Sequence, residues 1–124
     1  MSKSMLYPIL CAVAAMALVE SPAWAHVFPD RSVPKVGSVV DHSPDQVRIW
    51  FGGALEKAFS RLRVKNAQGK QVSKGDGQVA GKDDTLLETA LPSLSPGRYH
   101  VYWSVVGRDG HRTMGDFTFT IEGH

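Results

Sequence analysis

Apolar and polar residues alternate with a period of two along much of the chain. The alternation spans residues 47–51, 61–65, 98–106 and 117–121, and residues 85–89 form a shorter candidate of the same kind. Because successive side chains of a β-strand point to opposite faces, each segment is predicted to be a strand with one buried face. Helical periodicity is hard to find after residue 25.

The segments between these strands carry turn-forming residues. Asn66-Ala67-Gln68-Gly69 predicts a hairpin turn. Residues 75–84 are polar and glycine-rich, and we expect a long, mobile connection there without an element. Residues 26–44 contain three prolines and predict an extended edge strand with a loop. Several short strands in about 100 residues predict an all-β fold, a small antiparallel β-sandwich.

The first 25 residues differ from the rest. Residues 5–19 are apolar, follow one positive charge, and lead to Ala23-Trp24-Ala25, which places small residues at both positions that a signal peptidase reads. The apolar run is shorter than the roughly 20 residues of a spanning helix. Residues 1–25 are therefore predicted to be a secretory signal peptide. Cleavage after Ala25 leaves the domain 26–124, which is not expected to insert in a membrane.

Composition narrows the chemistry of that domain. The single cysteine, Cys11, lies in the predicted signal, so the mature domain has neither a disulfide nor a thiolate ligand. The formal net charge is +2, and both signs are interspersed along the chain. Because no basic run with interleaved aromatic residues occurs, nucleic acid is not predicted to be a partner.

Three residues form a candidate metal site. Cleavage after Ala25 would make His26 the first residue, whose α-amino group and imidazole can chelate one metal ion together. Asp109 and His111, separated by Gly110, would add a carboxylate and a second imidazole. This donor set suits Cu(II), and residues i and i+2 of an extended strand share a face. Two simpler interpretations stay open: Asp109-Gly110 is also typical of a hairpin turn, and any residue can follow a cleavage site.

The end of the chain resembles the closing signature of the CopC family of periplasmic copper-binding proteins. Residues 103–119 contain the tryptophan strand, the D-x-H motif and the G-x-F-x-F motif. Residues 96–103 are similar to the P-G-x-Y-x-V-x-W segment of the family, and a histidine directly after the signal agrees as well. Residues 43–51 resemble the early segments of the family less closely. The resemblance spans essentially the whole of residues 26–124.

This resemblance implies an immunoglobulin-like or cupredoxin-like Greek-key sandwich. It also implies a periplasmic protein of copper homeostasis and resistance that carries or sequesters one Cu(II) ion and is not an enzyme. The ligands would be His26, Asp109 and His111, which form a histidine brace at the amino terminus. An inner-membrane copper transporter of the CopD type would be its partner.

The chain departs from the family pattern at two places. Met114 is the single methionine after residue 25, and because thioether donors select Cu(I), we predict no separate Cu(I) site. Gly52-Gly53 stand where the family usually has an acidic or polar residue, so Glu56 is the nearest candidate for a further carboxylate.

Two other functions remain as alternatives. A copper monooxygenase would use the same brace, as in the lytic polysaccharide monooxygenases, but the domain leaves little room for a substrate platform. A metal-free interaction sandwich would take up no copper. Among the other conspicuous side chains, His42 is predicted to be a solvated loop residue and His100 a hydrogen-bonded surface residue, while Trp50 and Trp103 are predicted to pack in the core or at its edge.

Overall fold

The computed structural model describes residues 26–123, so the predicted signal peptide lies outside the described residues. Within that range the chain forms eight strands and one short 3-10 helix. The elements are β1 (Pro29–Val33), β2 (Val39–Val40), β3 (Gln46–Phe51), η1 (Lys57–Phe59), β4 (Arg61–Lys65), β5 (Gln78–Val79), β6 (Leu86–Ala90), β7 (Gly97–Val106) and β8 (Arg112–Ile121). In this part of the chain no helix has the length and apolar character needed to cross a bilayer.

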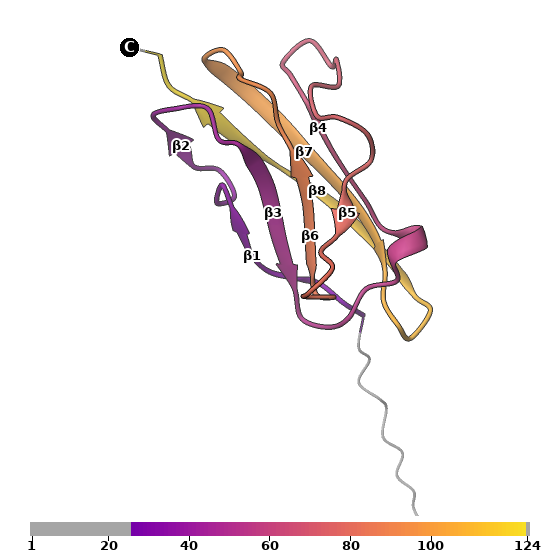
Figure 1. Ribbon diagram of the computed structural model, residues 1–124. Helices are drawn as coiled ribbons and strands as arrows, with labels where there is room; N and C mark the ends of the chain where they lie inside the picture. Colours follow the sequence, from indigo (N-terminus) through magenta and orange to yellow (C-terminus); the bar gives the residue numbers. More distant parts are fainter. Residues whose placement is uncertain (1–25, 124) are drawn as a thin grey trace, which may run out of the picture.

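The strands form two four-stranded sheets packed face to face, as Figure 1 shows. One sheet has the order β1-β3-β6-β5, and the other has the order β2-β8-β7-β4. The predicted β-sandwich is therefore confirmed. One pair departs from the antiparallel arrangement, because β2 runs parallel to β8. Residues 26–44, which are predicted to form one extended edge strand with a loop, instead contribute to both sheets: β1 lies at the edge of one sheet and β2 at the edge of the other.

The core lies between the sheets and follows the alternation in the sequence. Strand β3 buries every second residue against the opposite sheet, and β7 does the same over its whole length. The aromatic rings of Phe51 and Trp103 meet edge to face across the core, with centroids 5.3 Å apart. The most fully buried side chains are Val47, Ile49, Leu55, Leu62, Val64, Leu87, Val101, Val105 and Phe119.

The glycine-rich segment 75–84 is not without structure. It contains β5, which pairs with β6 and buries Val79. Gly77 lies so close to the backbone that an added Cβ would stand 2.8 Å from the Cβ of Leu62 and 3.1 Å from the carbonyl oxygen of Glu88. A two-residue strand shows too little alternation to be recognised, and here glycine permits a close approach between strands.

Strand β8 begins five residues earlier than the predicted strand 117–121. The apolar alternation stops at Gly115, which lies on the inward face of the strand. A Cβ at this position would stand 2.5 Å from Cζ2 of Trp103, so the indole ring of the neighbouring strand occupies the space of the missing side chain. The strand continues although its own sequence supplies no apolar residue there.

The two ends of the sandwich differ in what they carry. The turn between β7 and β8 lies at the same end as the first described residue, while β8 ends at the opposite end (Figure 1). The β7–β8 hairpin has ten paired positions, from Gly97↔Ile121 to Val106↔Arg112. This long hairpin carries residues 107–111 to the place where the chain enters the fold.

Candidate metal centre

The turn from Gly107 to His111 connects β7 and β8. The backbone N–H of Gly107 donates to the carbonyl oxygen of His111 at 3.1 Å, and the N–H of Gly110 donates back to the carbonyl of Gly107 at 2.9 Å. Gly110 has φ +86°, a conformation that favours glycine. Asp109-Gly110 therefore does form the hairpin turn, and the expected extended geometry of Asp109 and His111 is wrong.

The same turn nevertheless places Asp109 against His111. The backbone N–H of His111 donates to Oδ1 of Asp109 at 3.0 Å, and Nδ1 of His111 lies 3.2 Å from the other carboxylate oxygen. These hydrogen bonds, the one from the backbone first, hold the pKa of the Asp109 carboxyl below its usual value. The carboxylate is thus anionic throughout the neutral range.

His26 completes the cluster from the other end of the chain. Its ring centroid lies 4.9 Å from that of His111, with the two rings nearly perpendicular. One potential ligand atom from each of His26, Asp109 and His111 lies within 4.8 Å of the other two, and all three residues are exposed. The structure therefore brings together all three residues predicted from the sequence, in an arrangement that one metal ion could bridge.

Val27 fixes the backbone next to His26. The hydroxyl of Thr113 donates to the carbonyl oxygen of Val27 at 2.7 Å, and the Val27 side chain packs half-buried against the core. Gly107 makes room for it, since an added Cβ would stand 2.6 Å from Cγ2 of Val27 and 3.0 Å from Oδ1 of Asp109. Sequence reasoning missed Thr113 and Gly107, because an isolated threonine and a glycine next to a turn give no signal of a remote partner.

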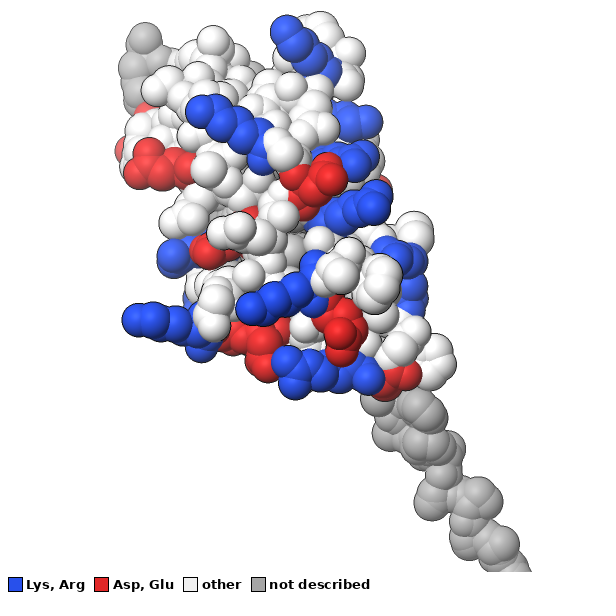
Figure 2. Space-filling model, turned by 45° about the vertical axis from the view of Figure 1, so that its right-hand side comes forward, with Lys and Arg blue, Asp and Glu red and all other residues white. Residues whose placement is uncertain are grey.

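The charges around the cluster are largely paired. The Arg108 guanidinium lies 3.0 Å from Oδ2 of Asp84 and 3.8 Å from the carboxylate of Glu56. The nearest candidate for an additional carboxylate, Glu56, thus faces an arginine and lies outside the metal cluster. Figure 2 shows Lys, Arg, Asp and Glu side chains mixed at the lower end of the molecule, where the grey segment begins. The site therefore does not lie in a field of a single sign.

The other conspicuous side chains lie elsewhere. His42 is exposed and contacts Asp41, as predicted for a solvated loop residue. His100 stacks on Tyr102 and lies 3.4 Å from Asp116 on the outer face of its sheet. Trp103 is buried, whereas Trp50 lies below the guanidinium of Arg31. Within residues 26–123, no other group of three histidine or acidic side chains meets as closely as the cluster at His26.

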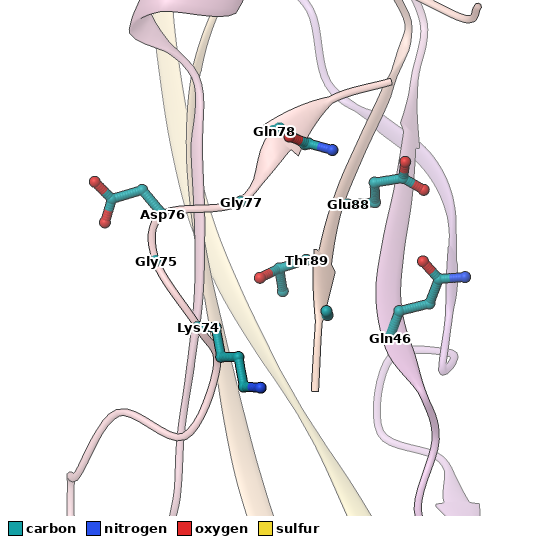
Figure 3. Close-up of a pocket in the computed structure, with 9 residues that line it drawn as sticks. Gln46, Lys74, Gly75, Asp76, Gly77, Gln78, Glu88 and Thr89 are labelled. Atoms are coloured by element: carbon teal, nitrogen blue, oxygen red, sulfur yellow. The ribbon is translucent and has the colours of Figure 1, made fainter. Parts of the chain in front are cut away.

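A separate hollow lies between β6 and the segment before β5 (Figure 3). It measures about 430 Å³. Its two carboxylates, Glu88 and Asp76, are paired with Arg48 at 3.4 Å and Arg63 at 2.8 Å, and no histidine lines it. The hydroxyl of Thr89 is buried there without a hydrogen-bond partner. This hollow lacks the donors of a metal site.

Comparison with known proteins shows which family this chain resembles. The model of the CopC domain matches residues 30–122 of this chain. Protein YobA of Escherichia coli is 28% identical over 122 residues, which cover 98% of this chain and 97% of that protein. The copper transport protein CutJ of Bacillus subtilis is 25% identical over 107 residues, which cover 86% of this chain but only 20% of that protein.

Solved structures agree with the fold. The crystal structure of CopC from Methylosinus trichosporium OB3b superposes with a TM-score of 0.71 and 31% sequence identity, covering 80% of this chain and 96% of that one. PcoC, a methionine-rich copper resistance protein from Escherichia coli, superposes with a TM-score of 0.69 and 27% identity, covering 79% of this chain and all of that one.

Proposed function

This chain belongs to the CopC family, and from that premise we propose that it carries or sequesters one Cu(II) ion through a histidine brace at His26. Asp109 and His111 complete the site. At the level of the family, the protein is a copper-binding protein of copper resistance and not an enzyme. One observation carries the finer proposal: three potential donors, which lie far apart in the sequence, come within 4.8 Å of one another in the fold.

The donor set explains the preference for Cu(II). In the proposed mature protein, His26 offers an amine and an imidazole nitrogen that close a six-membered chelate ring, and His111 offers a second imidazole. Nitrogen and oxygen donors in a tetragonal arrangement suit Cu(II), which stands highest in the divalent affinity series. The anionic carboxylate of Asp109 balances part of the charge of the ion. Met114 is exposed on the outer sheet face, and the absence of a separate Cu(I) site stays a prediction.

The proposal includes export to the periplasm and cleavage after Ala25. An amine at His26 exists only after that cleavage, and the exposed position of His26 supports it. A membrane copper transporter of the CopD type is the proposed partner. The match to CutJ supports this, since a region similar to this chain makes up one fifth of a copper transport protein. A functional association between such a domain and a transporter would explain why both occur in one polypeptide.

Family membership also weighs against the two alternatives. A copper monooxygenase would be an enzyme, whereas the family consists of copper-binding proteins. A metal-free interaction sandwich would have no reason to bring three donors together at an exposed end of the fold. Copper titration separates the carrier, which takes up one equivalent, from a metal-free sandwich, which takes up none. Peroxide production in the presence of a reductant, or glycan cleavage by the copper-loaded protein, would instead indicate the monooxygenase.

The test uses protein whose first residue is confirmed as His26 by mass spectrometry. Titration with Cu(II) should saturate at one equivalent and give a tetragonal electron paramagnetic resonance spectrum with nitrogen couplings. A matched variant carries one glycine before His26, which keeps every side chain and moves only the amine. We expect this extension to weaken binding strongly and to change the spectrum. Unchanged affinity and spectrum would show that the terminal amine is not a ligand.

A further inference from the structure

The outer face of the sheet formed by β4, β7 and β8 contains a hollow of about 460 Å³. The strand register sets its composition, because Arg61, Ser104 and Met114 stand side by side across the three strands. The next row brings Arg63, Tyr102 and Asp116 together. We call this feature the arginine hollow. Its lining residues include Arg61, Arg63, Tyr102, Ser104, Arg112 and Met114, together with the acidic Asp116.

Two of the three arginines in the hollow have no acidic partner. Arg63 is paired with Asp76 at 2.8 Å, and Asp116 lies 3.4 Å from His100. Within residues 26–123, neither Arg61 nor Arg112 makes an ion pair. The hollow therefore holds three guanidinium groups and the one carboxylate of Asp116, and two of these guanidinium groups make no ion pair.

Arg112 is held in place rather than free in solvent. Its Nη1 donates to the hydroxyl of Ser104 at 2.6 Å and to the carbonyl oxygen of Phe59 at 3.3 Å. A guanidinium fixed in this way loses less side-chain freedom when it binds a carboxylate, and it retains other N–H donors for a bidentate contact. The geometry thus favours a partner that presents carboxylate groups.

Exposed aromatic and apolar residues line the hollow or lie beside it, since Tyr102 and Met114 are lining residues and the backbone of Phe59 contacts Arg112. Tyr102 is 39% exposed, Phe59 is 56% exposed and Met114 is 66% exposed. Aromatic residues, methionine and arginine are the types enriched in protein interfaces and their energetic hot spots. Two unpaired cations are few for a polyanion such as a nucleic acid, whose affinity rests on many phosphate contacts. The combination instead fits a protein surface of mixed acidic and apolar character.

The hollow also borders the candidate metal centre. Arg112 follows His111 directly in sequence and begins β8, while Met114 is two residues further along the same outer face. A protein docked on this face would therefore lie next to the turn that holds Asp109 and His111.

We propose that the arginine hollow is the docking surface for an acidic segment of the protein with which this chain exchanges copper. The role in copper exchange rests on the proposed function, whereas the recognition of an acidic segment does not require copper. Carboxylates of the partner pair with Arg61 and Arg112, and its apolar groups cover Tyr102 and Met114. Docking there places the acceptor or donor site of the partner beside the exposed brace.

The first test uses copper-free protein, so that it is independent of the brace. A hexaglutamate peptide is titrated at low ionic strength, and backbone amide shifts are followed by NMR. We expect shifts confined to β4, β7 and β8, and a loss of binding as salt shortens the Debye length from about 30 Å at 0.01 M to about 8 Å at 0.15 M. The double variant Arg61→Gln/Arg112→Gln should weaken binding roughly tenfold.

A matched double variant removes the same charge elsewhere. Lys35→Gln/Lys82→Gln changes two exposed lysines outside the hollow and should leave the shifts on β4, β7 and β8 in place. The apolar part of the surface is tested with a glutamate-rich peptide that carries one central tryptophan. Met114→Ser should weaken the binding of this peptide more than it weakens the binding of hexaglutamate. Shifts spread over the whole surface, or equal losses in the two double variants, would overturn the proposal in favour of a nonspecific charge effect.

Copper loading separates this proposal from the proposed function. Arg61→Gln/Arg112→Gln should retain the Cu(II) stoichiometry and spectrum of the unaltered protein while it binds the peptide roughly tenfold more weakly. If copper binding is absent but peptide binding is present, the brace has failed and the acidic docking surface stands. If the arginine variant instead abolishes a dimer of the free protein seen by sedimentation, the occupant is a second copy and the proposal is wrong.

Discussion

The hydrogen bond between Thr113 and Val27 gives a prediction that joins stability to metal binding. Thr113→Val removes the hydroxyl that donates to the Val27 carbonyl at 2.7 Å, with little change in side-chain shape. Leaving a partly buried carbonyl oxygen without its hydrogen-bond donor lowers the stability of the folded state by about 1–3 kcal/mol. For a domain of this size, each kcal/mol lowers the melting temperature by about 4–8 °C. Because Val27 adjoins His26, the variant should also bind copper more weakly.

Thr89→Val is the matched control. Thr89 is a buried strand threonine as well, but its hydroxyl has no hydrogen-bond partner. Removing it should leave the melting temperature unchanged or raise it, because a buried polar group without a partner destabilises the fold. Thermal unfolding of the copper-free proteins, followed by tryptophan fluorescence, measures the first effect, and competitive copper titration measures the second. Equal changes in both variants would refute the role assigned to Thr113.

Three further predictions concern single residues. Gly107→Ala places a Cβ 2.6 Å from the Val27 side chain, so copper affinity should fall, whereas Gly81→Ala, which has open space around it, should bind as the unaltered protein does. Asp109→Asn should lower copper affinity at neutral pH, because the hydrogen bonds from His111 hold the pKa of this carboxyl below its ordinary value of 3.8 and keep it anionic there; competitive copper titration measures the loss, and unaltered affinity would contradict this. Gly115→Ala should destabilise the fold by about 1–3 kcal/mol through its clash with Trp103 and shift the tryptophan emission, and unaltered unfolding would show that the ring can move.

The sequence predicts the strands with clear alternation and misses the elements that depend on remote contacts. Residues 47–51 and 98–106 alternate strictly, and both form strands within a residue or two of the predicted bounds. The short strand β5 and the beginning of β8 lack this pattern. In β8 the indole ring of Trp103 occupies the space of the missing apolar side chain. The sequence around Gly115 therefore gives no sign that the strand continues there, because the residue that fills the space belongs to another strand.

The sequence predicts which residues form the candidate site but not how the fold brings them together. A histidine after a cleavage motif and the D-x-H pattern identify His26, Asp109 and His111, and the structure brings them together. The expected reason, an extended strand with both side chains on one face, is wrong because the residues lie in and after a tight turn. The contacts of Val27 with Thr113 and Gly107 depend on the register between distant segments, which residue types alone do not reveal.

The cluster of His26, Asp109 and His111 joins the two sheets, and this affects the stability of the folded protein and its resistance to proteolysis. His26 leads into β1 of one sheet, whereas Asp109 and His111 belong to the hairpin of the other. An ion bound by all three would therefore act as a cross-link between the layers at an end where no disulfide can form. Free copper at one hundred times its dissociation constant would stabilise the native state by about 2.7 kcal/mol. Loaded molecules should accordingly outlast empty ones during proteolysis.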